Sequence, residues 1–346
     1  MEFFPRLPDE EENGACHTAE EEELPTIPLQ ILLTLEDNLF VRIAVPKQGV
    51  VCSNQSRVDR ICSVLDNRVC YEVPWGPKIY IGEYKSTPFF IASAPVGSGS
   101  GLMFTELYAA GAEYIVRYGS DDYGSDDVKN PGEYEHEIIK IIDEADNLYG
   151  YNIASGTPEE DWGQVVAASH VLVKCLKEES NSRNLQVETR ICHHLENYHS
   201  LRTPHKFASD REKVLRAQLA QLEARKDANA AMTESGSACA KKSSFDMETA
   251  VLFTVAKDFT GYTIDSSKAT TGKDTSSDYV QSTNTGTNTG TNTSTRSYVH
   301  KHAASVLQTV NKENHKLGPY EGENKTIALK LEQTFIEFIL SAMMRL

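Results

Sequence analysis

The chain has 346 residues, of which 40% are hydrophobic and 24% are charged. This composition is sufficient for a large buried core, and it excludes both a fully disordered chain and a bundle of membrane helices. The formal net charge is −16, and half of it falls in residues 1–26, where nine acidic side chains accompany a single base. The remaining negative charge argues against a binding surface for nucleic acid or for an anionic membrane.

The cysteine pattern bears on the compartment. The seven cysteines are an odd number and form no CxxC pair. This predicts reduced thiols rather than a disulfide framework or a zinc site. No apolar run approaches the roughly 18 residues of a transmembrane helix, and the first residues lack the basic and apolar regions of a secretion signal. We therefore expect a cytoplasmic protein with no membrane contact and no bound metal.

Two tracts of biased composition flank or interrupt one predicted domain. Residues 1–26 form an acidic tail, and residues 270–297 are dominated by Thr, Asn, Gly and Ser, including TNTGTNTGTNTSTRS. The second tract has almost no apolar side chain to offset the entropy lost on ordering. We predict a disordered tail, a single domain over 27–346, and a flexible insertion within that domain at 270–297.

Between these tracts, strand-like and helix-like segments alternate along the chain. The segments that predict strands are 40–45, 48–52, 78–84, 88–94, 113–118 and 138–142. Apolar spacing or capping signals predict helices at 55–65, 102–110, 159–178, from Ser209, at 246–257 and in the final segment around 327–342. Alternation of this kind predicts an α/β fold with a mainly parallel sheet.

Three features suggest an anion site. The glycine loop GSGSG, residues 97–101, follows an apolar run and precedes a helix, so its backbone N–H groups can approach an anion. Arg117 lies near the end of the next predicted strand, where ligands bind in open α/β sheets, and Arg57 follows an earlier strand. Each feature alone is better explained as a tight turn or a surface ion pair. Together they favour a site whose guanidinium groups hold phosphate oxygens.

The segment SSFDMETAVLF is the most informative motif, because Asp246, Met247 and Glu248 come just before an apolar helix. One interpretation is an acidic first turn that stabilises the helix dipole. The other is that Glu248 accepts hydrogen bonds from two sugar hydroxyls while Met247 packs against the sugar face.

With these motifs in order, CSNQSR, ASAPVGSGSG, YIVRYGS and FDMETAVLF, the chain resembles the nucleoside phosphorylase superfamily, and uridine phosphorylase in particular. That superfamily also includes purine nucleoside phosphorylase and methylthioadenosine nucleosidase. The resemblance extends from about Gln30 to Leu346, with the Thr/Asn tract as an insertion. It implies a single-domain, three-layer α/β/α fold with a mixed central sheet.

The resemblance also implies roles for individual residues. Those matching the phosphate site are Arg57, Arg117, Ser120 and Gly97, and those matching the ribose site are Met247, Glu248 and, from a neighbouring subunit, Gln30. Arg117 and Glu248 match the catalytic pair. The candidates for contact with the base are Arg202, Asp121 and Lys268, while His193 and His194 are better explained as packing or surface residues.

Several positions depart from the family pattern. Ser53-Asn54-Gln55 replaces a Gly-Asp-Pro turn, and Lys78 is the only base where a neighbouring subunit normally supplies an arginine. Asp121 and Asp122 follow Ser120, and two acids beside a phosphate site are electrostatically unfavourable. These departures leave open a catalytically weak homologue that acts as an interaction or regulatory subunit.

Within the resemblance, two arginines favour phosphorolysis over hydrolysis. Ser267 stands near the catalytic Asp of the purine enzymes, which favours a pyrimidine substrate, although a purine nucleoside phosphorylase stays open as an alternative. We expect a pentosyltransferase of pyrimidine salvage that converts uridine and phosphate to uracil and ribose 1-phosphate. It would need no cofactor beyond inorganic phosphate and would form a homodimer or a higher homo-oligomer.

Overall fold

The computed structural model describes ten stretches of the chain, namely residues 33–36, 39–72, 77–121, 138–146, 165–194, 242–260, 262–264, 279–281, 300–309 and 322–346. Several sequence predictions fall outside these stretches. They are the acidic tail 1–26, the helix from Ser209, and the site candidates Gln30, Arg202 and Lys268, together with Asp122 and Ser267.

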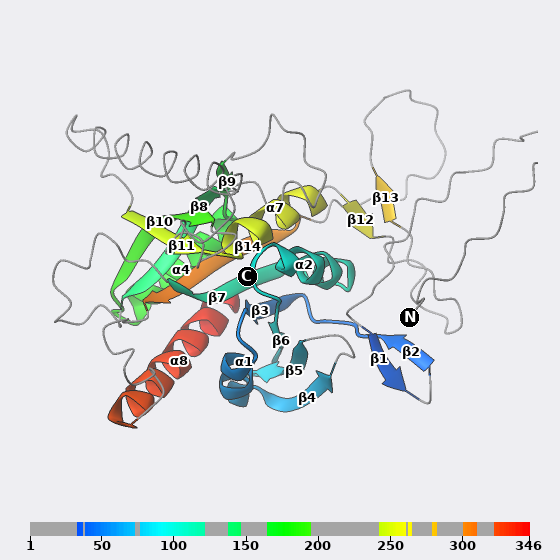
Figure 1. The fold of residues 1–346 in the computed structure, drawn as a ribbon, viewed down its shortest axis with the longest axis horizontal. Helices are drawn as coiled ribbons and strands as arrows, with labels where there is room; N and C mark the ends of the chain where they lie inside the picture. Colours follow the sequence, from blue (N-terminus) through cyan, green and yellow to red (C-terminus); the bar gives the residue numbers. More distant parts are fainter. Residues whose placement is uncertain are drawn as a thin grey trace, which may run out of the picture.

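A ten-stranded sheet forms the centre of the fold (Figure 1), with strand order β11-β10-β8-β14-β7-β3-β6-β5-β4 and β9 paired to β8. Its strands are β3 (Gln48–Cys52), β4 (Asp66–Glu72), β5 (Lys78–Tyr84), β6 (Thr87–Ser93), β7 (Tyr114–Asp121), β8 (Ile139–Asp146), β9 (Val165–Ala167), β10 (Val187–His194), β11 (Lys242–Asp246) and β14 (His302–Thr309). Two separate pairs are β1 (Leu33–Glu36) with β2 (Leu39–Arg42), and β12 (Tyr262–Ile264) with β13 (Tyr279–Gln281).

The sheet is mixed, as the resemblance implied. Strands β6, β3, β7 and β14 run parallel to one another. Strands β8, β10 and β11 are also mutually parallel, but β8 runs antiparallel to β14, so this half of the sheet is reversed. The two halves therefore meet at the β14–β8 pair.

Helices cover both faces of the sheet. They are α1 (Gln55–Ile61), α2 (Ser100–Ala109), α4 (His170–Ser182), α7 (Thr249–Phe259) and α8 (Gly322–Met343), with short 3-10 turns η1 (Cys62–Val64) and η2 (Gly97–Gly99). One apolar core joins the sheet to α2 and α7, and a second joins it to α1, α4 and α8.

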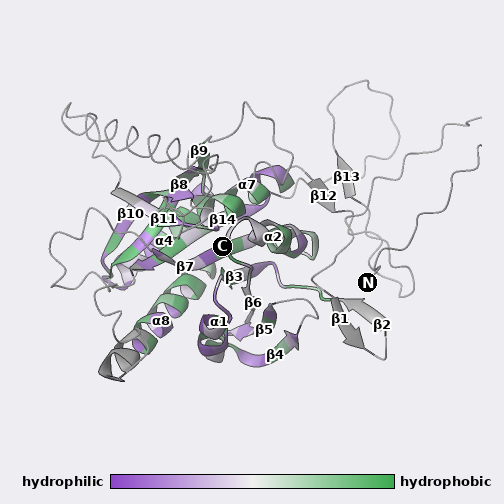
Figure 2. Ribbon diagram, viewed as in Figure 1, coloured by the Kyte–Doolittle hydropathy of each residue, from purple (hydrophilic) through white to green (hydrophobic). Residues whose placement is uncertain are grey.

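Consecutive residues of β7 contribute to different cores, because side chains alternate between the two faces of a strand. Ile115 packs in the first core, whereas Val116 packs in the second. In Figure 2 the described part of α8 alternates between hydrophobic and hydrophilic residues, as expected of a helix with one face on a core. The predicted three-layer α/β/α architecture is thus confirmed.

Some predicted elements were wrong in place or kind. The helix expected over 159–178 is instead β9 followed by α4, because Val165 to Ala167 pair with the end of β8. Asp246 ends β11, and α7 begins only at Thr249. Within the predicted insertion 270–297, β13 pairs antiparallel with β12, and the rest of that tract lies outside the described residues.

A buried carboxylate connects β11 to β7, although β11 is four places away in the strand order. Asp121, at the end of β7, accepts hydrogen bonds from the Ser244 hydroxyl (2.9 Å) and the Phe245 N–H (3.2 Å) on β11. It also accepts from Lys140 Nζ of β8 at 2.6 Å, and Arg190 Nη1 of β10 lies 3.8 Å away. The reversed half of the sheet therefore curls back until its last strand reaches β7.

These contacts give Asp121 a different setting from the predicted one. The sequence placed it at the base or beside the phosphate. In the structure its side chain is fully buried and neutralised by Lys140. The expected repulsion between Asp121 and bound phosphate is thus reduced by a local cation.

Asp121→Ala is expected to lower the free energy of unfolding by about 3–5 kcal/mol, because it leaves the charge of Lys140 buried without its partner. Denaturant unfolding measures this loss. Asp66→Ala, at an exposed position of β4, is the matched control and should change stability by less than about 0.5 kcal/mol. Equal effects of the two changes would contradict the assignment of Asp121 as the tie between β7 and β11.

Candidate active site

Four segments that are far apart in the sequence meet around one buried ion pair, Arg117 with Glu248. Glu248, at the junction of β11 and α7, accepts a hydrogen bond from the Gly97 N–H at 2.8 Å and pairs with Arg117 Nη2 of β7. The same guanidinium nitrogen lies 2.6 Å from Asp246 Oδ1 and 3.4 Å from the Ser53 hydroxyl, which follows β3. The structure thus brings together the glycine loop, the β7 arginine and the FDMET motif, as predicted.

The local structure around Asp246 determines where Glu248 lies. Asp246 accepts hydrogen bonds from the backbone N–H groups of Met247 (2.7 Å) and Thr249 (2.9 Å), so Asp246 provides the capping interaction at the start of α7. The Thr249 hydroxyl in turn contacts Ser305 of β14 at 2.9 Å. Glu248 occupies the N-cap position of α7 but makes no capping bond, because its carboxylate is directed to Gly97 and Arg117 instead.

Arg117 is almost fully buried, with 2% of its surface exposed. Its Nη1 atom has no hydrogen-bond partner among the described residues, although Nη2 has several. A buried donor without a partner costs free energy, so such an atom marks a place where a ligand oxygen would be favourable. Gly119 makes this arrangement possible, because a Cβ atom there would collide with the Arg117 guanidinium.

The second predicted phosphate arginine, Arg57, is also buried. Its Nη2 donates to the Ser120 hydroxyl at 2.8 Å, and its guanidinium lies 4.8 Å from the centre of the Tyr118 ring. Its Nε lies 3.2 Å from Glu332 of α8, which also accepts from Arg60 at 2.7 Å. The structure therefore places Arg57 and Ser120 together.

Sequence reasoning missed Glu332. The signal was present, because Glu332 lies three residues before the buried Phe335 on the apolar face of an amphipathic helix. A carboxylate at such a position needs a cationic partner. The local sequence does not say which of the chain's arginines that partner is.

The charges in this region balance. Three cations, Arg57, Arg60 and Arg117, are accompanied by three carboxylates, Glu332, Asp246 and Glu248. Burial raises the pKa of Glu248 to about 7, and the Arg117 charge opposes that rise. Burial therefore favours the neutral form of Glu248, while the Arg117 charge favours the ionised form.

The remaining candidates separate into two groups. Met247 is half-buried and precedes Glu248 in the chain, and its contact with ribose stays a prediction. Gln30, Arg202 and Lys268 lie outside the described residues.

A buried pair that the sequence analysis did not foresee lies one strand away on β10. There His193 Nδ1 is 2.5 Å from Asp146, and the His193 ring is 5.4 Å from that of Phe245. This agrees with the interpretation of His193 as a packing residue, held here by a carboxylate.

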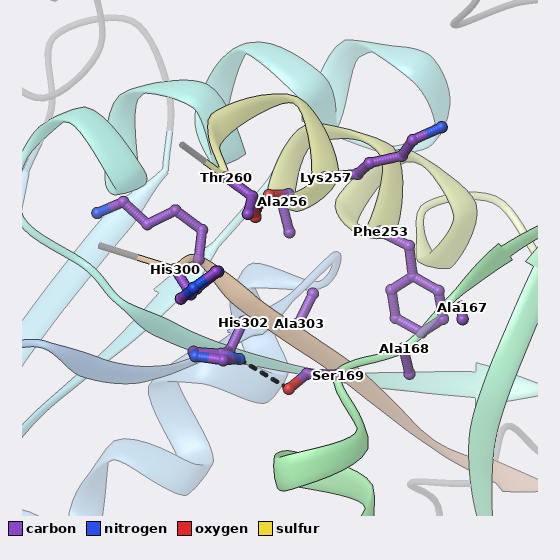
Figure 3. Close-up of a pocket in the computed structure, with 11 residues that line it drawn as sticks. Ala167, Ala168, Ser169, Phe253, Ala256, Lys257, Thr260, His300, His302 and Ala303 are labelled. Atoms are coloured by element: carbon purple, nitrogen blue, oxygen red, sulfur yellow. Dashed lines mark hydrogen bonds between the residues drawn. The ribbon is translucent and has the colours of Figure 1, made fainter. Parts of the chain in front are cut away.

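A separate cavity of about 210 Å³ lies at the far end of α7. Figure 3 shows its lining, in which the Phe253 ring lies beside Ala167 and Ala168, and the His302 ring is hydrogen-bonded to Ser169 at 2.8 Å. None of the residues at the Arg117–Glu248 pair lines it. Across the described stretches there is no cluster of three metal-ligating side chains and no helix long and apolar enough to cross a membrane.

No family model and no curated protein sequence matches the chain. Solved structures do match. Uridine phosphorylase from Vibrio fischeri is 15% identical in sequence and matches with a TM-score of 0.53. The match covers 87% of this chain and 93% of the uridine phosphorylase chain. Purine nucleoside phosphorylase from Toxoplasma gondii in complex with immucillin-H is 11% identical with a TM-score of 0.54, covering 87% and 92%.

The chain has the nucleoside phosphorylase fold. A nucleosidase with this fold, the methylthioadenosine/S-adenosylhomocysteine enzyme of Campylobacter jejuni, is 12% identical with a TM-score of 0.51 and covers 87% of this chain and all of its own. The same fold therefore occurs in phosphorylases and in a nucleosidase, and the choice between them depends on the side chains of the site.

Gly119→Ala is expected to displace the Arg117 guanidinium and to weaken the binding of inorganic phosphate at least about tenfold, or ~1.4 kcal/mol. Isothermal titration calorimetry with phosphate measures this change. Val116→Ala, whose side chain points to the opposite core, controls for a general loss of stability in β7. Phosphate affinity that survives in Gly119→Ala but falls in Val116→Ala would contradict this account.

Proposed function

We propose that the protein cleaves the N-glycosidic bond of a nucleoside with inorganic phosphate as the nucleophile. The observation that carries this proposal is the convergence of buried Arg117, the Gly97 N–H and Glu248. A second buried arginine, Arg57, contacts Ser120 on the same strand as Arg117. The fold supports it, because both phosphorylases and a nucleosidase share that fold.

In this reaction a phosphate oxygen forms a bond to the anomeric carbon of the sugar, while the bond from that carbon to the base nitrogen breaks. The bonding electron pair leaves with the base. Arg57 and Arg117 would hold the phosphate, and the Ser120 hydroxyl and the Gly97 N–H would orient it. The phosphate charge stabilises the oxocarbenium-like sugar, so these residues act mainly by electrostatic preorganisation.

The ribose would lie against Met247, with its 2′- and 3′-hydroxyls donating to Glu248. Gln30 from a neighbouring subunit would approach the 5′ end of the sugar, so we further propose a homodimer or a higher homo-oligomer. We place the enzyme in the cytoplasm and expect it to need no cofactor besides phosphate.

We propose uridine as the nucleoside and pyrimidine salvage as the role. The argument is the absence of the purine enzymes' Asp at Ser267, with Arg202 and Lys268 as the base-binding candidates. Asp121 is a weaker candidate for the base, because its carboxylate already accepts three hydrogen bonds from neighbouring strands. A purine nucleoside is the alternative substrate.

A second candidate function is favoured by one observation. Each predicted phosphate arginine already pairs with a carboxylate of the chain, Arg57 with Glu332 and Arg117 with Asp246 and Glu248. A site neutralised in this way attracts a phosphate dianion less strongly. It also suits an enzyme that uses water, or a weak homologue retained as a regulatory subunit.

Incubation with uridine is expected to release uracil only when inorganic phosphate is present. Arg117→Ala is expected to lower kcat/KM by an amount that corresponds to a loss of at least a few kcal/mol of transition-state stabilisation. Chromatography of the free base, with and without phosphate, measures both effects. A panel of uridine, inosine and methylthioadenosine tests the choice of base. Release at equal rates without phosphate would favour hydrolysis, and no release from any nucleoside would favour the regulatory homologue.

Glu248→Gln is expected to lower kcat/KM for uridine more than for 2′-deoxyuridine, because uridine offers two hydroxyls to the carboxylate and 2′-deoxyuridine offers one. A hydrogen bond to a charged acceptor is roughly twice as strong as a neutral one. Parallel kinetics on the two nucleosides measure the difference. An equal loss on both would remove Glu248 from the sugar site.

A further inference from the structure

The carboxylate of Glu248 occupies the donors that a phosphate ion would need. One of its oxygens accepts the Gly97 N–H at 2.8 Å, and the other pairs with Arg117 Nη2. A carboxylate and a phosphate accept from guanidinium and backbone N–H groups in the same way. The chain therefore supplies its own anion to these donors.

The burial of Glu248 and Arg117 means that phosphate cannot bind Arg117 without affecting Glu248. Glu248 and Arg117 are each about 2% exposed, so neither can exchange its partner for bulk water. A phosphate dianion that entered while Glu248 stayed in place would meet its negative charge at short range in a region of low polarity. Binding of phosphate and retention of the Glu248–Arg117 pair are therefore mutually unfavourable.

Arg117 does not lose all its support when Glu248 leaves. Asp246 Oδ1 remains 2.6 Å from Nη2 and is itself fixed by the first turn of α7. Nη1, which has no partner among the described residues, is also available to a ligand oxygen. Asp246 thus keeps its contact with Nη2 while the Glu248 contact with the same nitrogen is exchanged for a ligand oxygen.

We propose that Glu248 acts as an internal competitor of phosphate: it fills the anion site in the free protein, and phosphate binding displaces it toward the sugar. This deepens the proposed function and rests on it, since the same carboxylate is then presented to the ribose hydroxyls. The consequence is an order of binding, in which phosphate enters first and thereby completes the ribose site.

The exchange depends on pH. The groups that face Glu248 are Arg117 from β7, Asp246 from β11 and the Gly97 N–H from η2. Burial and Asp246 raise the pKa of Glu248, Arg117 and Gly97 lower it, and the result is about 7. Below that pH Glu248 is neutral and holds Arg117 more weakly, so an anion should bind better at pH 6 than at pH 8.

Sulfate is the suitable probe, because it is a tetrahedral dianion whose charge does not change between pH 6 and 8. In this proposal sulfate binds only to protein in which Glu248 is protonated or displaced. Because the pKa of Glu248 is about 7, sulfate binding is then expected to weaken about tenfold from pH 6 to pH 8. Glu248→Gln should bind sulfate at pH 8 about tenfold more tightly than the wild type, with little pH dependence. Isothermal titration calorimetry gives these affinities.

Two further variants make the result decisive. Glu179→Gln changes a carboxylate that pairs with Arg183 and Arg345, and it should leave sulfate affinity and its pH dependence as in the wild type. Glu248→Ala removes the competitor without leaving an amide beside Arg117. If Glu248→Gln fails to fold by its melting curve, Glu248→Ala answers the same question.

The outcomes separate the two proposals. Sulfate binding that is equal in wild type and both Glu248 variants, at pH 6 and at pH 8, would overturn the competition and leave phosphorolysis standing. If sulfate and phosphate bind to none of these proteins, the anion site does not exist and both proposals fall. Tighter, pH-independent binding in the variants, together with their loss of uridine cleavage, would support the two roles of Glu248.

Discussion

The site depends on one buried cation. Arg117 lies in the middle of the central sheet, where an uncompensated charge would cost several kcal/mol, and the chain surrounds it with two carboxylates that come from the end of β11. This requirement brings the β11–α7 junction to β7, and through the Gly97 N–H it brings the glycine loop to the same place. Arg117, Glu248 and Gly97 are thus neighbours because Arg117 is buried.

A second buried charge keeps this arrangement in register. Asp121 lies four residues after Arg117 on β7, and it binds Ser244 and Phe245 just before Asp246 on β11. The two strands are therefore joined twice, by a carboxylate on β7 and by carboxylates on β11. Contacts at two points prevent β7 and β11 from sliding past each other as well as from separating. The position of Glu248 relative to Arg117 is therefore fixed.

The arginines of the site are neutralised within the protein, so the region is balanced before any ligand arrives. Such balance stabilises the fold, since each buried guanidinium keeps an oppositely charged neighbour. It also opposes the entry of a dianion. A carboxylate whose pKa is raised to about 7 reconciles the two demands, because it is close to losing its charge under ordinary conditions. The stability of the protein and the proposed binding of anions are thereby linked in one residue.

Much of the fold and part of the site could be predicted from the sequence. The predicted strands and helices from Gln48 to Tyr118 and the glycine loop depend on local patterns, and the structure contains them. The strand β4 within this range and the strand β11 at the start of the FDMET motif were not predicted. The resemblance carried by those motifs also led to the three-layer fold and to the meeting of Arg117 with Glu248. Periodicity and turn residues act over a few positions, so they can be recognised from the sequence alone.

The partners of buried charges were decided only by the tertiary structure. Nothing near Asp121 in the sequence indicates Lys140 and Ser244, and nothing near Arg57 indicates Glu332, because these pairs join residues 19 to 275 positions apart. The position of β14 at the boundary between the two halves of the sheet is likewise set by its pairing with β7 and β8, which the sequence does not indicate. Electrostatic pairing in a core depends on distance in space, and the curl of the sheet, not the order of residues, determines that distance.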